Sequence, residues 1–448
     1  MLTFKQAIIP VITMALLIML SVLFWNAPIQ VALFFEIMII ISLALFWGYK
    51  WKEIEDMLFS SFRNIGNVIL ILFLLGMMIA LWIAVGTVPT MIYYGLKTIS
   101  PKYFFILSFI STSMVSMAVG TAVGTASTIG LALISIAQTM GLNLPLAAGA
   151  IISGSYVGDR MSPVSSIAII TAHVSESGLM DMIYHMFKTA VIPYIITAFT
   201  FFIIGLTNFS NNNAAADLIT LSEMLKNNFQ ISFWLLLPPI LIIILAVFKI
   251  PTIINLSLNI LFSLGMGIIF TNNSWSKLLN IMFRGIKQRT DITFIDNILA
   301  RGGLTSMLEL ISLIIFAVLL GGLLEKLGVL NSIIRPFLHL IKEKIHLVAV
   351  TLFAGIVSAT LGCNQFLGVF LPAKMLGDNY DQMHLDRKDL ARAVGDSGLI
   401  FSPLIPWNVN ALMMTAVLGV NTIDYLPFAF FPLLMPLSNL LVTHFEKD

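Results

Sequence analysis

The chain has 448 residues, of which 58% are hydrophobic and 10% are charged, and its formal net charge is +2. A soluble domain carries about 25% charged residues, so these few charges cannot cover a soluble surface. The composition excludes an ordinary cytoplasmic enzyme, a disordered chain and a nucleic-acid-binding protein. The lone cysteine, Cys363, excludes a disulfide scaffold and a cysteine-built metal site. A polytopic helical membrane protein remains.

Long stretches without Asp, Glu, Lys or Arg follow one another along the chain, and the longest runs from Tyr103 to Gly158. A helix needs about 20 apolar residues to cross a bilayer, so we expect about 10–13 membrane segments in an all-α fold. The first segment is longer than a signal-peptide core and lacks a cleavage site, which predicts a retained helix. The uninterrupted segments lie near 7–25, 31–48, 66–85, 103–120, 186–206, 231–248, 252–270, 305–324 and 424–443.

Other apolar segments are interrupted, and the interruptions occur twice in the same order. A Gly/Thr-rich break at 120–130 precedes Gly-Asp and Ser-Pro at 158–163. A Gly/Asn break at 362–368 precedes Gly-Asp and Ser-Pro at 395–403. Unpaired backbone at membrane depth is tolerated only where it faces protein or a wet cavity. Paired breaks are typical of the binding site of a secondary transporter, so we predict two inverted repeats around one cavity.

This repeat divides the chain. We expect a first membrane half over 1–207, a polar linker over 208–230 and a second membrane half over 231–448. Within the second half, the segment 277–302 carries basic residues among Leu, Ile and Phe. Such a pattern is typical of an amphipathic helix at the membrane interface, and a solvated connector is the alternative.

Three charged residues stand at the repeated breaks: Asp159, Arg160 and Asp396. A carboxylate at the bilayer centre costs about 2.5–3.5 kcal/mol, so it is rarely placed there without a function. We predict that Asp159 and Asp396 bind a proton or a cation, Na⁺ included. Arg160 is expected to pair with Asp159 or to bind a substrate carboxylate. In the alternative interpretation, Asp159 and Arg160 pair with each other in water at a helix end.

Hydroxyl and amide side chains near the breaks are further candidates for substrate or ion binding. Small hydroxyl residues also let membrane helices pack closely, which is the alternative role. Asn364 and its neighbour Gln365 form a polar pair in an otherwise apolar run. The candidates are Thr121, Thr125, Ser162, Asn364, Ser397, Ser402 and Asn408. The sequence carries no phosphate-binding loop, metal-binding His pair or nucleophile elbow, so we expect no cofactor and no enzymatic activity.

Several motifs together resemble the NhaC-type sodium/proton antiporter family, and most closely its malate/proton–lactate/sodium antiporter branch. The resemblance covers nearly the whole chain. It implies a multi-pass antiporter of the bacterial inner membrane, with inverted repeats and re-entrant hairpins. The motifs are Val88-Pro89-Thr90, the segments 92–96, 158–163, 301–303 and 321–329, His384-Leu385-Asp386-Arg387 and Ser402–Asn408.

The chain also departs from the family pattern at positions that would supply oxygen ligands. The family's Ser-Asp-Thr-Thr stands here as Ser165-Ser166-Ile167-Ala168. In the second half Gly395 replaces a Glu, and Leu399 and Phe401 replace two Thr. Sodium prefers several hard oxygen ligands, so these losses should weaken a sodium site.

We therefore predict an antiporter that exchanges a small organic anion or an amino acid, with proton coupling favoured over sodium coupling. The alternative is a plain Na⁺/H⁺ antiporter, in which Asp159 and Asp396 suffice with backbone carbonyls. A membrane enzyme or scaffold without transport is the remote alternative. The expected partners are the small solute, H⁺ with Na⁺ as the rival ion, and the lipid bilayer; a homodimer is left open.

Overall fold

The computed structural model describes residues 2–25, 27–63, 65–207, 223–271, 273–286 and 302–446. Within these ranges the regular structure is entirely helical. By length and apolar composition, 8 of the described helices can cross a membrane, or up to 10 if each bent pair counts as one span. The expected all-α polytopic fold is confirmed, and the upper count of 10 equals the lower end of the expected range of about 10–13.

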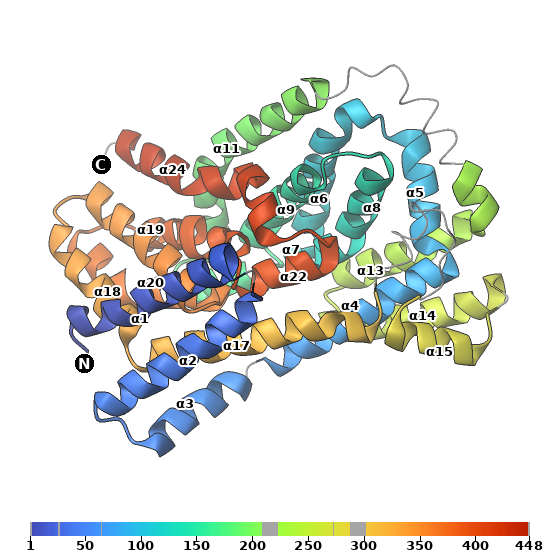
Figure 1. Ribbon diagram of the computed structural model, residues 1–448. Coiled ribbons are helices and arrows are strands. Elements are labelled where there is room, and N and C mark those ends of the chain that lie inside the picture. Colours follow the sequence, from blue (N-terminus) through green and yellow to red (C-terminus); the bar gives the residue numbers. More distant parts are fainter. Residues whose placement is uncertain are drawn as a thin grey trace.

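The N-terminal helices form one side of the molecule. In Figure 1, α17 runs beside α2 and α3, and α14 lies against α4, so segments far apart in sequence pack together. The elements are α1 (Phe4–Met19), η1 (Leu20–Phe24), α2 (Ile29–Phe46), α3 (Trp51–Arg63), α4 (Gly66–Val85) and α5 (Thr87–Thr98).

The first broken region follows. Helix α9 begins where the Asn143 side chain accepts a hydrogen bond from the Leu146 backbone amide at 2.9 Å, and it ends at Ser162, just before Pro163. The elements are η2 (Pro101–Tyr103), α6 (Phe104–Val119), α7 (Ala122–Thr125), η3 (Ala126–Gly130), α8 (Leu131–Thr139), α9 (Leu144–Met161), α10 (Ser166–Val174) and α11 (Leu179–Thr207).

A middle group of helices connects the two broken regions. The predicted linker (208–230) and the predicted interfacial segment (277–302) lie only partly within the described residues, because 208–222 and 287–301 lie outside them. The described part of the interfacial segment is helical over 277–284, in α15. The elements are η4 (Phe233–Leu236), α13 (Leu237–Val247), α14 (Thr252–Phe270), α15 (Trp275–Arg284), η5 (Leu304–Met307), α17 (Leu308–Lys326), α18 (Val329–Ile334) and η6 (Arg335–Leu340).

The second broken region closes the chain, and two of its helix pairs are bent, by 48° and 53°. The elements are α19 (Lys344–Leu361), α20 (Gln365–Gln382), α21 (Arg387–Val394), η7 (Gly395–Leu399), η8 (Ser402–Leu404), α22 (Val409–Leu418), α23 (Thr422–Tyr425), η9 (Leu426–Phe428) and α24 (Phe430–Phe445).

The helix breaks in the two regions have the same backbone form. Gly120 (φ 73°) is followed by extended Thr121 (φ −150°), whose side chain caps α7. Cys363 (φ 54°) is followed by extended Asn364 (φ −146°), whose side chain caps α20. Each break thus combines a left-handed residue with a polar helix cap, as the repeated sequence pattern suggests.

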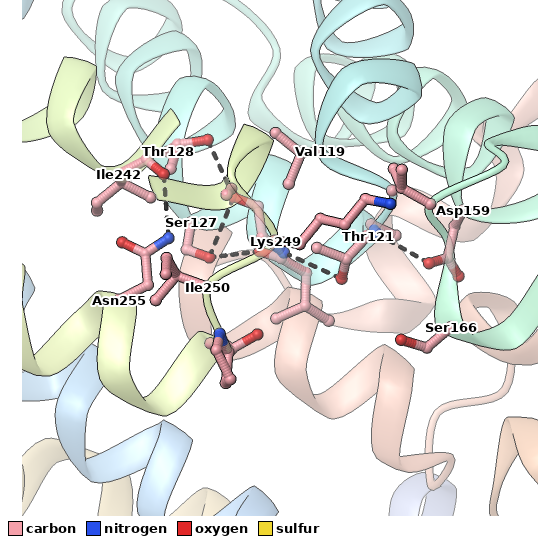
Figure 2. Close-up of a pocket in the computed structure, with 18 of the residues that line it drawn as sticks. Val119, Thr121, Ser127, Thr128, Asp159, Ser166, Ile242, Lys249, Ile250 and Asn255 are labelled. Carbon is pink, nitrogen blue, oxygen red and sulfur yellow. Dashed lines mark hydrogen bonds between the residues drawn. The ribbon is translucent and has the colours of Figure 1, made fainter. Parts of the chain in front are cut away.

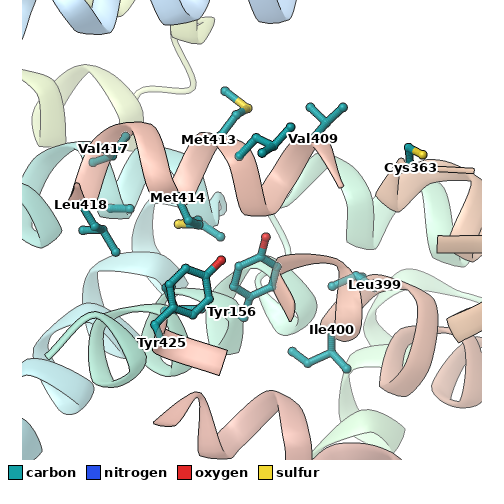
Figure 3. Packing of buried hydrophobic residues seen from close by; sticks show 14 of the residues in the cluster. Tyr156, Cys363, Leu399, Ile400, Val409, Met413, Met414, Val417, Leu418 and Tyr425 are labelled. Atoms are coloured by element: carbon teal, nitrogen blue, oxygen red, sulfur yellow. The ribbon is translucent and has the colours of Figure 1, made fainter. Parts of the chain in front are cut away.

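Buried side chains join the two regions into one core. Figure 3 shows Met414, Val417 and Leu418 of α22 beside Tyr156 of α9 and Tyr425 of α23. The Tyr425 hydroxyl donates a hydrogen bond to the Pro403 carbonyl at 2.6 Å. This core holds the Ser-Pro break of the second region against α9.

Candidate functional site

A cavity of about 520 Å³ lies where the first broken region meets α13 and α14 (Figure 2). One wall comes from the α6–α7 break, the segment after α9 and the residue Asp159. The opposite wall is mostly apolar and comes from Ile242 to Leu256. Gln365 and Asn410 reach the cavity from the second broken region. A cavity of this size suits a small solute.

Asp159 of α9 lies at this cavity with 7% of its surface exposed. Its Oδ1 accepts a hydrogen bond from the Ala122 backbone amide at 3.2 Å, at the start of α7. Its Oδ2 accepts one from Gln365 Nε2 at 3.1 Å. Neutral donors therefore hold the carboxylate, and Asp159 forms no ion pair with any of the described residues.

A polar network continues from Asp159 into the second broken region. Gln365 Nε2 also donates to the Leu399 carbonyl at 3.3 Å. Asn410 Nδ2 donates to Gln365 Oε1 at 2.5 Å and to Ser402 Oγ at 3.2 Å. The network joins the Asp159 carboxylate in the first broken region to the Ser-Pro break in the second. A change in the charge of Asp159 can therefore alter hydrogen bonds in both broken regions.

The hydroxyl groups of the first break mostly donate to carbonyls of their own helix. Thr125 donates to the Thr121 carbonyl at 2.9 Å and Thr128 to the Gly124 carbonyl at 2.9 Å. Ser127 donates to the Val123 carbonyl. Thr121, Ser127 and Thr128 line the cavity, whereas Thr125 is buried beside it. The protons of Thr125, Ser127 and Thr128 are thus already donated, whereas Thr121 Oγ1 accepts a hydrogen bond from the Gly124 amide at 3.5 Å. All of these hydroxyl oxygens keep an acceptor lone pair for a ligand.

Arg160 forms its ion pair with Asp396, not with its neighbour Asp159, and both side chains are fully buried. The guanidinium also donates to Thr189 Oγ1 at 3.0 Å, and Asn439 Nδ2 donates to Asp396 Oδ2 at 2.7 Å. Neither charged residue lines the cavity. The expected pairing of Arg160 with Asp159 is wrong, because consecutive residues of a helix point in different directions. The pair joins α9 to η7, α11 and α24.

The remaining predicted site residues form hydrogen bonds with backbone groups, some within their own segment and some on a neighbouring helix. Ser162 Oγ donates to the Met117 carbonyl (2.7 Å), Ser397 Oγ to Ala393 (2.7 Å), Ser402 Oγ to Leu399 (2.8 Å) and Asn408 Nδ2 to Ala359 (2.9 Å), and Asn364 Oδ1 accepts from the Phe366 amide (2.8 Å). Of the predicted set, Thr121 and Asp159 line the cavity, and Ser402 contacts it through Asn410.

Sequence reasoning did not select several polar residues that line the cavity, namely Tyr156, Ser166, Lys249, Asn255 and Asn410. Gln365 was noted beside Asn364 but not chosen as a site residue. Its polarity inside an apolar run is the signal that finds it. Lys249 is a lone lysine between apolar segments, and no motif marks it.

A separate charged cluster lies at the C-terminal end. His185 Nε2 and Asp389 Oδ1 are 2.6 Å apart, and Glu446 lies within the same group. Arg392 donates to both Glu446 oxygens, at 3.0 and 2.9 Å, and Lys344 lies 3.5 Å from Asp389. With these cations on its carboxylates, the cluster is an ion-pair network and does not fit a metal site.

The fold and the cavity define a polytopic membrane transporter. The profile described as "Na+/H+ antiporter family" matches residues 154–445. A malate-2H(+)/Na(+)-lactate antiporter of Bacillus subtilis is 35% identical over 425 residues, covering 95% of this chain and 91% of the relative. The Na(+)/H(+) antiporter NhaC of the same organism is 32% identical over 448 residues, with 100% and 99% coverage.

An arginine/ornithine antiporter, ArcD, of Halobacterium salinarum is 28% identical over 438 residues, with 97% and 90% coverage. The chain belongs to the Na⁺/H⁺ antiporter family, in the NhaC group, and the resemblance inferred from the sequence is confirmed. It is a multi-pass protein of the bacterial cell membrane. The relatives are antiporters for different solutes, so membership of the family does not identify the solute that this chain exchanges. That solute has to be inferred from the residues of the site.

Proposed function

We propose that the protein is a secondary antiporter that exchanges a small organic anion or an amino acid, with protons as the coupling ion. The observation that carries the proposal is the cavity of about 520 Å³, in which Asp159 is the acidic residue of the lining. A cavity of this volume is larger than an ion needs, and its mostly apolar α13–α14 wall suits the carbon skeleton of a solute.

The surroundings of Asp159 favour a proton over sodium. A sodium ion is held by several hard oxygen ligands. Each carboxylate oxygen already accepts one hydrogen bond, from the Ala122 amide or from Gln365, so only its remaining lone pairs are left for an ion. Ser166 and Ile167 line the cavity where the family pattern has an acid and a hydroxyl residue. A proton needs one carboxylate oxygen and no further ligand.

Plain Na⁺/H⁺ exchange is the second candidate. The hydroxyl oxygens of Thr121, Ser127 and Thr128 line the same cavity and keep lone pairs that can bind a cation. In that case Asp159 is the sodium-binding carboxylate and small-solute exchange is absent. Asp396 is the weaker candidate for either ion, because its carboxylate is paired with Arg160.

We also propose that the two membrane halves, 1–207 and 231–448, are inverted repeats. The matching backbone at Gly120-Thr121 and at Cys363-Asn364 supports this, as does the common order of the breaks. In such a transporter the binding site lies between the repeats, and alternating access moves one repeat against the other. The network from Asp159 through Gln365 to Ser402 then crosses the moving boundary.

Counterflow in proteoliposomes tests the proposal. Purified protein is reconstituted with unlabelled organic acids and amino acids inside, and labelled solutes are added outside without any cation gradient. Solute exchange under these conditions supports the proposal. A sodium-driven pH change without solute exchange supports the second candidate and overturns the first.

A further inference from the structure

Lys249 has an unusual place at the cavity. It lies between α13 and α14 and has a left-handed backbone, with φ of 60°. Few residues other than glycine adopt this conformation, and Asn and Asp do so more readily than Lys. Figure 2 shows the Lys249 side chain extending across the cavity toward Asp159. The turn thus presents an ammonium group to the wall that carries the carboxylate.

Among the described residues, the cavity lining holds one positive and one negative side chain, Lys249 and Asp159. In the part of the chain that the structure describes, no ion pair within 4.0 Å includes either residue. Asp159 is held by neutral donors, and Lys249 is an exposed residue that lines the cavity. Two opposite charges therefore face the same space without neutralising each other.

We propose that the cavity binds a zwitterionic α-amino acid, with Lys249 on its carboxylate and Asp159 on its ammonium group. This inference rests on the proposed function and names its substrate class. The substrate's two charges are complementary to the two walls, and charge-assisted hydrogen bonds are about twice as strong as neutral ones. Ile242, Ile243 and Ile250 supply an apolar surface for its side chain.

The arrangement selects against a dicarboxylate. A second carboxylate on the substrate would face the carboxylate of Asp159, and like charges at close range repel. It also explains exchange, because Asp159 is neutralised either by the ammonium group of the substrate or by a proton. The two cannot occupy the carboxylate together, so binding of one requires release of the other.

The test uses the full-length protein in proteoliposomes, with counterflow of the common L-amino acids, their carboxamides, lactate and malate. The variants are Lys249→Gln, Lys249→Arg and, as a matched control, Lys374→Gln. Lys374 is an exposed lysine outside the cavity lining, over the Phe370 ring. Elution profile and melting temperature confirm that each variant is folded.

We expect the wild type to exchange at least one amino acid and to bind its carboxamide about tenfold more weakly, since the amide removes the charge that Lys249 recognises. Lys249→Gln should abolish this preference, and Lys249→Arg and Lys374→Gln should retain it. An unchanged preference in Lys249→Gln overturns the inference. Exchange of lactate or malate without any amino acid also overturns it, while the proposed function stands. No organic solute exchange at all overturns both.

Discussion

Asp159 and Asp396 stand at matching places in the two broken regions, each one residue after a glycine and shortly before a Ser-Pro pair. Their surroundings differ. Asp159 is 7% exposed, lies at the cavity and, among the described residues, accepts hydrogen bonds from two neutral groups. Asp396 is fully buried and is paired with Arg160 and Asn439. The same motif thus places one carboxylate where a ligand can reach it, and the other where a counter-ion already neutralises it.

The difference shows how burial and pairing separate a functional acid from a structural one. A buried ion pair is expensive to break, because each partner left alone is an uncompensated charge in a poorly solvated site. Asp396 is therefore poorly suited to exchange ligands during a transport cycle. Asp159 has no ion pair with any residue of the described ranges, so a proton or a cation can neutralise it. In this account Asp159 carries coupling and Asp396 holds the helices together.

The largest expected effect is on stability. Asp396→Asn leaves Arg160 buried without a counter-charge, and we expect a loss of about 3–5 kcal/mol in the free energy of unfolding. Thermal melting of the purified protein in detergent measures this. Asp381→Asn, at a side chain that is 55% exposed, is the control and should change little. A near-normal melting temperature for Asp396→Asn would remove the structural role assigned to this pair.

Substitution of Arg160 tests the structural role of the same ion pair from its other partner. Arg160→Gln should destabilise the protein, while the combined variant Arg160→Gln/Asp396→Asn recovers part of the loss, because no buried charge is left unpaired. The apparent KM for the transported solute should stay within about threefold of wild type in whatever fraction folds, a difference of under 1 kcal/mol. A large rise in KM with normal stability would instead place Arg160 in substrate binding, as one interpretation of the sequence has it.

Asp159→Asn should have the opposite profile. The substitution keeps the shape of the side chain but removes the charge that a proton or cation neutralises. We expect coupled transport to fall by about 100-fold or more, which corresponds to roughly 2.7 kcal/mol. Stability should change by less than about 1 kcal/mol. Uptake driven by a pH gradient measures coupled transport, and the melting curve of the same variant measures stability. Full activity in Asp159→Asn would show that coupling lies elsewhere.

Gln365 provides a smaller effect at the same carboxylate. Gln365→Ala removes the donor to Asp159 Oδ2 and the link to Asn410. A hydrogen bond to a charged group contributes about 1.5–3 kcal/mol, so we expect transport to fall by about tenfold. Gln382→Ala, at an exposed glutamine near the end of the same helix, is the matched control. Equal rates in the two variants would mean that the network does not support transport.

The smallest effect concerns Glu446, beyond the last span. Burial alone would raise the pKa of this carboxyl, but hydrogen bonds from Arg392 and Lys188 outweigh it and lower the pKa from 4.5 to about 2. A lowered pKa in the folded state stabilises the protein above pH 4.5, and this contribution is lost as the pH falls toward 2. Glu446→Gln should cost about 0.5–1 kcal/mol at pH 7 and nothing at the acidic end. Melting curves of the wild type and of Glu446→Gln from pH 7 down to pH 2 should therefore converge at the acidic end.

The sequence predicted the membrane spans and the paired helix breaks, because charge-free apolar runs and clustered glycines follow directly from the physics of the bilayer. It also selected Asp159 and Thr121, which line the cavity. It did not predict the Arg160–Asp396 pair, since a contact between distant helices leaves no local pattern. Lys249 was missed for the same reason: a lysine in a turn is usual, and only the packing of α13 and α14 brings it to the cavity.

Among the hydroxyl and amide candidates, the sequence identified the right segments but not the roles. Asn364 and Asn408 cap helices, whereas their neighbours Gln365 and Asn410 reach the cavity. Residues one or two positions apart at a helix start point in different directions, and the choice between capping and lining depends on which carbonyls and amides the neighbouring helices present.

Coupling at Asp159 is tested most directly by uptake into proteoliposomes at fixed pH, with sodium replaced by choline on both sides. The loss of the family's acid and hydroxyl residues at Ser166 and Ile167 predicts that solute exchange continues at a similar rate in choline and responds to an imposed pH gradient. Collapse of uptake without sodium would contradict proton coupling and would identify Asp159 with its neighbouring hydroxyls as a sodium site.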